Sequence, residues 1–277
     1  MEIITVVLSS LLLLISPVGF VVDQVAEDSI RSRLVGAESL QVRVDNGSPI
    51  QLLQGRVERV RIAGRGISLT SDLRVEVAEL ETDPIDVDFE SLRRGEVVLD
   101  KALQGALRLV LIEEDLNRYL ASEEVEERLS SFRIGGLNPA QLRERDRYEI
   151  NDPSIQFLPD DRLRVSLELE DLVKGGGLSI VAESGLSVSA GDRLVLIEPT
   201  LIVDGTPAPQ RLVDTLIGGL NERLSLQSLE ALGVTARVID FSVQPDGLEL
   251  AMWVSVDPRV TAPEMAMVEG VTIENEP

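Results

Sequence analysis

Between about Gly36 and Val256, aliphatic residues recur at every second position in one segment after another. Residues 163–169 alternate Leu or Val with Arg, Ser or Glu, and residues 248–256 have the same period. Because successive side chains of a strand point to opposite faces, each such segment is predicted to be a strand with one apolar face. Turn-forming residues such as Pro245–Gly247 lie between the segments, which is typical of antiparallel hairpins.

Two segments have a helical period instead. Glu113–Ser131 is predicted to form two short helices that separate near Ser122, and Pro207–Leu224 one amphipathic helix with Thr206 as its N-cap. The nearly continuous apolar run at 193–203 predicts a strand buried on both faces. We therefore expect an α+β fold that is mostly antiparallel β, in one elongated domain with an apolar groove or tube and a few amphipathic helices.

The N-terminal segment Ile3–Val22 contains no charged residue. As a helix it would be about 30 Å long, enough to cross a bilayer core. Three interpretations remain open, namely a membrane anchor, a cleaved signal peptide and a buried helix, because the positive flanks of an anchor or signal are absent. Residues 1–22 are expected to attach the protein to a membrane, and residues 23–35 to form an amphipathic helix. A β-rich domain is expected at residues 36–256, followed by a disordered acidic tail at residues 257–277.

The composition excludes several kinds of chemistry. The chain has no Cys and no His, so thiol nucleophiles, disulfides and imidazole metal ligands are absent. Its 48 acidic and 26 basic residues give a net charge of −22, which makes nucleic acid an unfavourable partner. The two lysines, Lys101 and Lys174, lie in no Ser-x-x-Lys motif, so a serine nucleophile with a lysine base is not expected. We predict a protein that is not an enzyme and has no cofactor.

An acidic cluster near residue 86 is the strongest candidate for a metal or carboxylate site. In an extended chain, Asp86, Asp88 and Glu90 share one face, and their oxygens suit a hard cation such as calcium. The segment lacks the spacing and the glycine of a calcium loop, and a solvated strand edge explains it equally. No metal site is predicted, and a hydrolase built on Asp86 and Asp88 is the less favoured enzymatic alternative.

Three arginines on one side of a predicted strand, Arg59, Arg61 and Arg65, are candidates for a lipid headgroup. A guanidinium group matches the geometry of a phosphate in a two-point contact. The alternative, which the pattern favours, is that these arginines face solvent and pair with nearby acids such as Glu58.

The apolar faces of the predicted strands are candidates for contact with acyl chains. Only 3% of the residues are aromatic, so the interior is aliphatic, and an aliphatic wall is sufficient to bind hydrocarbon. The same pattern describes a solid sandwich core, and the alternation alone does not separate the two. The candidate residues are Leu107, Leu109, Leu111, Leu163, Val165, Leu167, Leu250, Met252 and Val254.

Several segments resemble the LmeA family of phospholipid-binding proteins, in the form found in cyanobacteria. They include LLLLISPVGFVVDQVAEDSIRSRL, VRVDNGSPIQLLQGRVERVRIAGRGISL, LETDPIDVD and GLSV. The most specific matches are Leu53–Val57 with Gly64–Gly66, and Asp83–Asp86. The resemblance implies an envelope protein that binds phospholipid on an apolar surface or in a tunnel, similar to the tubular folds of the bactericidal/permeability-increasing type. It implies no catalytic residue, and the chain departs from mycobacterial-type members in lacking a clear cleavable signal.

The sequence thus predicts a non-catalytic phospholipid-binding protein, membrane-associated in the cell envelope, the periplasm or at the thylakoid, which binds acyl chains on an aliphatic β-surface. The alternative is a membrane-anchored acidic assembly protein with a solid core and a protein partner. An anionic protein gains nothing from an anionic leaflet, so attachment is expected to come from apolar contact. The lipid, the oligomeric state and the side of the membrane stay open.

Overall fold

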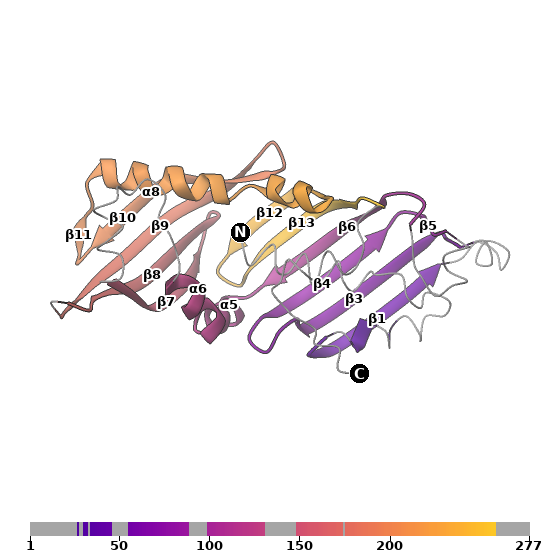
Figure 1. Cartoon of the computed structure of the whole chain (residues 1–277), viewed down its shortest axis with the longest axis horizontal. Helices are drawn as coiled ribbons and strands as arrows, with labels where there is room; N and C mark the ends of the chain where they lie inside the picture. The colour runs from indigo at the N-terminus through magenta and orange to yellow at the C-terminus, as the bar shows by residue number, and fades with distance from the viewer. Residues whose placement is uncertain are drawn as a thin grey trace.

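The structure, a computed structural model, describes residue 27 and residues 30–32, 34–45, 55–88, 99–130, 148–173 and 175–258. Within these residues the chain forms two large antiparallel β-sheets that lie side by side along the long axis of the molecule (Figure 1). The prediction of a mostly antiparallel β-structure with a few helices is therefore confirmed.

The first sheet has six strands in the order β1-β3-β4-β6-β13-β12. One face is packed, because alternate residues of every strand are buried against the same core. At its centre Leu107 of β6 lies between Leu80 of β4 and Met252 of β13, with exposed fractions of 3%, 8% and 0%. The strands are β1 (Gly36–Asp45), β3 (Arg59–Ser68), β4 (Arg74–Thr82), β6 (Leu103–Leu111), β12 (Val234–Gln244) and β13 (Gly247–Val256).

The second sheet has five strands in the order β11-β10-β9-β8-β7. Each strand follows its neighbour in the sequence, so the sheet is a simple meander joined by short turns. The strands are β7 (Tyr148–Leu158), β8 (Arg162–Asp171), β9 (Gly177–Ser189), β10 (Arg193–Val203) and β11 (Thr206–Pro207). A separate two-stranded pair consists of β2 (Arg56–Val57) and β5 (Ile85–Asp86).

The helices confirm one prediction and correct another. Helices α5 (Glu113–Leu120) and α6 (Glu123–Ser130) are the two short helices predicted on either side of Ser122. Helix α8 (Gln210–Arg223) runs along the second sheet beside β10 (Figure 1), but it begins at Gln210 rather than Pro207. Thr206 and Pro207 instead form β11, which pairs with the end of β10. A 3₁₀ helix, η2 (Leu226–Leu232), precedes β12.

Two turns of the second sheet join it to the edge strand β12 of the first. The amide of Val238 in β12 donates a hydrogen bond to the carbonyl of Gly191 in the β9–β10 turn, at 2.6 Å. The amide of Val243 donates to the side chain of Asp161 in the β7–β8 turn, at 2.7 Å. The two turns thus provide hydrogen-bond acceptors for amide groups of β12 that point away from β13. They cover this edge of the first sheet, which would otherwise be open.

The prediction that residues 193–203 are buried on both faces is wrong. Leu194 of β10 is buried, but Ile197 and Ile202 on the opposite face are 44% and 37% exposed. A register shift between Ile197 and Thr200 also interrupts the strand. One face of the run is buried or half-buried, and the other carries isolated exposed aliphatic residues, which are common on protein surfaces.

The terminal predictions fall largely outside the described residues. The segment Ile3–Val22 and the tail beyond residue 258 are not described, whereas residues 27, 30 and 31 are helical and Ile30 is buried. In the described part of the chain, no helix has both the length and the apolar character needed to cross a bilayer.

Candidate lipid-binding surface

One face of the second sheet is a continuous band of aliphatic side chains that crosses four strands. The pairing places Ile155 of β7, Val165 of β8, Ala182 of β9 and Leu201 of β10 in one row. Parallel rows on the same face contain the residues Ile150, Phe157, Leu163, Leu167, Leu169, Leu178, Ile180, Leu186, Val188, Leu194, Leu196 and Val203.

This aliphatic band is only partly buried. Val165, Leu167 and Ile180 near its centre are half-buried, and Leu178 at one end is 38% exposed. Phe157 and Leu194 are its buried members. The corresponding face of the first sheet differs, because Val60, Val75 and Met252 there are completely buried. Among the described residues, partly exposed aliphatic side chains are therefore concentrated on the second sheet.

On β8 and at Glu183 of β9 the opposite face of the sheet is polar and carries an ion-pair cluster, whereas on β10 it carries Ile197 and Ile202. Glu183 of β9 accepts hydrogen bonds from Arg164 and Arg162 of β8, at 3.1 and 3.2 Å. The hydrogen bond from Arg164 is the main reason why the pKa of Glu183 lies below its usual value, and the bond from Arg162 adds to it. The two faces of β8 thus differ sharply, and they provide a natural pair of test and control positions.

Helix α5 holds the free edge of β7, the outermost strand of this sheet. The side chain of Asn117 donates to the carbonyl of Ile155 at 2.9 Å and accepts from the amide of Ile155 at 2.7 Å. The carboxylate of Glu113 accepts from the amide of Phe157 at 2.9 Å. Side chains of a helix thereby satisfy backbone groups that another strand would otherwise satisfy, and they fix the border of the apolar face.

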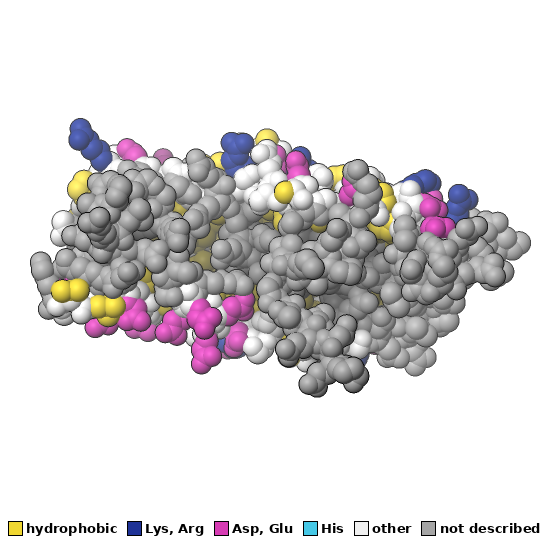
Figure 2. Space-filling model, in the orientation of Figure 1, with side chains coloured by type: hydrophobic (Ala, Val, Ile, Leu, Met, Phe, Trp, Pro, Cys, Tyr) yellow, Lys and Arg dark blue, Asp and Glu magenta, His cyan; other side chains and the backbone are white. Residues whose placement is uncertain are grey.

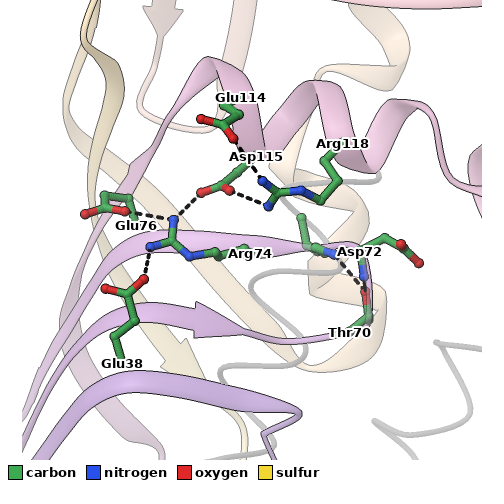
Figure 3. A network of polar contacts seen from close by, with 9 residues as sticks. Glu38, Thr70, Asp72, Arg74, Glu76, Glu114, Asp115 and Arg118 are labelled. Carbon is green, nitrogen blue, oxygen red and sulfur yellow. Dashed lines mark hydrogen bonds and ion pairs between the residues drawn. The ribbon is translucent and has the colours of Figure 1, made fainter.

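The same helix is anchored to the first sheet by a buried carboxylate (Figure 3). Asp115 of α5, whose side chain is 2% exposed, pairs with Arg74 of β4 at 2.5 Å and with Arg118 at 2.8 Å. Arg74 also reaches Glu38 of β1 and Glu76. Burial by itself would lower the pKa of Arg74, but hydrogen bonds to these three acids raise it above its usual value. Because α5 contacts both sheets, it sets the position of β7 relative to the first sheet.

The three arginines predicted for a headgroup lie on β3, with Arg59, Arg61 and Arg65 all on its outer face and Val60 and Ile62 on its buried face. Arg59 pairs with Glu81 at 2.8 Å, and Arg61 pairs with Asp45. The hydrogen bond from Arg61 lowers the pKa of Asp45.

These arginines are separated from the aliphatic band. Four strand spacings lie between β3 and β12 in the first sheet, which corresponds to about 19 Å. The aliphatic band begins only beyond β12. The described residues therefore do not unite the predicted headgroup and acyl-chain candidates in one site.

The nine predicted acyl-chain residues are divided between the two sheets. Three of them, Leu163, Val165 and Leu167, belong to the half-buried aliphatic band. The other six belong to the packed core of the first sheet and are at most 4% exposed: Leu107, Leu109, Leu111, Leu250, Met252 and Val254.

The acidic cluster near residue 86 is engaged in ion pairs. Asp86 binds Lys101 at 2.5 Å and Arg56 at 2.9 Å. The hydrogen bond from Lys101 is the largest cause of the lowered pKa of Asp86. Within the described residues, no group of three or more acidic side chains is arranged to hold a metal ion. Asp86 thus links β5 to Arg56 of β2 and to Lys101, and Glu90 lies outside the described residues.

The strand alternation did not show that Ile155 of β7 lies beside β8, or that Leu201 and Val203 of β10 lie beside β9 on the same face. The β10 segment is aliphatic, whereas the alternation of β7 is interrupted, and in neither case does the pattern show which strands are neighbours. Only the meander order of the second sheet brings them onto one face. The edge contacts of Asn117 and Glu113 left no signal in the sequence, because an acidic helix with one asparagine has the composition of any solvated helix.

Comparison with known proteins identifies a family for the chain. A family model described as LmeA-like phospholipid-binding matches residues 15–252. No curated protein and no solved structure matches the chain at a significant level. The matched range includes all of the second sheet and nearly all of the first, so the chain belongs to the LmeA-like phospholipid-binding family.

Proposed function

We propose that this protein binds phospholipid without catalysing a reaction, and that the acyl chains lie on the aliphatic band of the second sheet. The observation that carries the proposal is the contrast between the two sheets, one with a fully packed apolar face and one with a partly exposed apolar face. A soluble domain rarely leaves a large contiguous apolar face accessible unless something binds there.

The energetics favour hydrocarbon as the ligand of this band. Each methylene group transferred from water to an apolar surface contributes about 0.8 kcal/mol, before the costs of ordering the lipid and the protein. A chain that covers several rows of the band would therefore gain several kcal/mol without a specific polar contact. Leu163, Val165 and Leu167 supply the centre of this surface, together with Ile180 and Leu201 of the neighbouring strands.

The proposed place of action is the membrane surface of the cell envelope. Membership of a phospholipid-binding family supports an association with membranes. The net charge of −22 argues against attraction to anionic headgroups, so apolar contact would provide the attachment. The alternative of an acidic assembly protein with a solid core describes the first sheet well, but it leaves the accessible band of the second sheet without a role.

Native mass spectrometry of the full chain, released from membranes with a mild detergent, tests the proposal. Adjacent residues of β8 give a matched pair of variants, because Leu167 lies on the aliphatic face and Ser166 on the polar face. We expect phospholipid adducts on the wild type and on Ser166→Asn, and a several-fold lower occupancy on Leu167→Asn. A wild-type protein that carries no lipid and takes none up from vesicles would refute the function. Equal occupancy in both variants would refute the location.

A further inference from the structure

The turn between β8 and β9 carries two exposed aliphatic side chains at the end of the second sheet. Leu172 is 56% exposed and Val173 is 74% exposed. Leu178 on the aliphatic band and Ile202 on the opposite face lie near the same end of the sheet and are 38% and 37% exposed. This end is the extreme left of the molecule in Figure 1, and Figure 2 shows hydrophobic side chains on the surface there. Polar residues are the usual occupants of such turns.

The turn is built to project outward. The side chain of Asp171 accepts a hydrogen bond from the amide of Val173 at 3.0 Å, and its carbonyl accepts from the amide of Gly175 at 2.8 Å. Gly175 and Gly176 have φ angles of 70° and 100°, which glycine adopts readily. A Cβ atom added at either glycine would meet no atom within 4 Å. Hydrogen bonds within the turn thus hold it, and its two glycines border open space.

We propose that this turn inserts into the surface of a lipid bilayer and is the end at which acyl chains pass between the membrane and the protein. The inference rests on the proposed function of the aliphatic band. Its main support is continuity: Leu178 pairs with Leu169 at the turn and belongs to the same face as Ile180 and Ala182. An acyl chain that leaves the bilayer at the turn would therefore reach the band without crossing water.

The charges around the turn define the kind of bilayer that fits. Glu168, Glu170 and Asp204 at this end of the sheet are exposed. In the sequence of the turn, Lys174 offsets only one of these negative charges, and the whole chain is strongly anionic. Acidic residues beside the inserted side chains would be repelled by an anionic leaflet. The turn therefore fits a membrane surface of zwitterionic lipid, entered by apolar contact.

The absence of cysteine from the chain allows a direct test on the full-length protein. Val173→Cys is labelled with the environment-sensitive fluorophore NBD, and Ser71→Cys, an exposed position in the β3–β4 turn of the first sheet, is the control. With phosphatidylcholine vesicles, we expect the label at position 173 to shift to shorter wavelength and to be quenched by doxyl-labelled lipids. The label at position 71 should do neither. A label at position 173 that stays in water on vesicle-bound protein overturns the inference.

A charge-introducing variant separates this inference from the proposed function. Leu172→Asp combined with Val173→Asp should slow lipid uptake from phosphatidylcholine vesicles by about tenfold or more, while lipid already bound after expression stays at the wild-type level. Unchanged uptake would refute membrane entry at the turn and leave lipid binding on the band intact. Replacing half of the phosphatidylcholine with phosphatidylglycerol should weaken insertion, and stronger insertion would contradict the charge argument. A response at position 173 to a soluble protein fraction but not to vesicles would assign the turn to a protein partner instead.

Discussion

Leu107 and Leu167 form a matched pair that tests the difference between the two sheets. Both are leucines in the interior of central strands, and both face the apolar side of their sheet. Leu107 is 3% exposed and lies between Leu80 and Met252, whereas Leu167 is half-buried beside Ile180. Substituting each with alanine removes the same atoms from two different environments.

The packing predicts different losses of stability. At Leu107 the rigid neighbours cannot close the space, so the loss combines the transfer and cavity contributions and amounts to about 3–4 kcal/mol of the free energy of unfolding. At Leu167 the side chain is already partly accessible and no closed cavity forms, so a loss of about 1 kcal/mol is expected.

Urea unfolding of delipidated protein measures both losses of stability. Far-UV circular dichroism follows the whole fold, and the fluorescence of Trp253, the only tryptophan, follows the first sheet. Lipid occupancy should follow the opposite order, with Leu167→Ala losing bound phospholipid and folded Leu107→Ala retaining it. Equal losses of stability within about 0.5 kcal/mol, or a loss of lipid only in Leu107→Ala, would refute the reasoning.

Two further predictions concern the contacts around the sheets. Asn117→Ala removes both hydrogen bonds to Ile155. In hydrogen exchange, the amide of Ile155 should therefore exchange with solvent markedly faster, while amides in β6 keep their protection. Unchanged exchange at Ile155 would show that α5 does not hold this edge. The pKa of Asp86 is lowered in the folded protein, so its stabilisation is present above the unfolded pKa of about 3.9 and is lost as the pH falls below it. The melting temperature of Asp86→Asn should therefore lie below that of the wild type at pH 7, with the gap narrowing at pH 3; a constant gap would contradict the assignment.

The sequence predicted strands well because the alternation of apolar residues is a local property. Strand β7 escaped detection because a register shift between Asn151 and Ser154, where Asp152 has a φ of 49°, interrupts its alternation. The start of α8 was misplaced because Thr206 and Pro207 satisfy the local rules for a helix start equally well. Their pairing with β10 is a tertiary contact that no local rule contains.

The candidate site could be predicted only in part, because exposure of an apolar face depends on what packs against it. Leu107 and Leu167 have the same local pattern, yet one lies in a core and the other on an accessible surface. The Arg74–Asp115 ion pair joins residues 41 positions apart, and nothing in the acidic segment at 113–120 distinguishes the buried Asp115 from its solvated neighbours. Strand order and sheet membership are the information that the alternation lacked.

Photo-crosslinking with a phosphatidylcholine that carries a diazirine near the end of one acyl chain tests the central claim most directly. After irradiation of the full-length lipid complex, the crosslinked peptides are identified by mass spectrometry. We predict crosslinks to alternate residues of β8, β9 and β10 on the aliphatic band, including Val165, Leu167 and Ile180. Crosslinks to β6 and β13 in the first sheet, with none on the second sheet, would contradict the account.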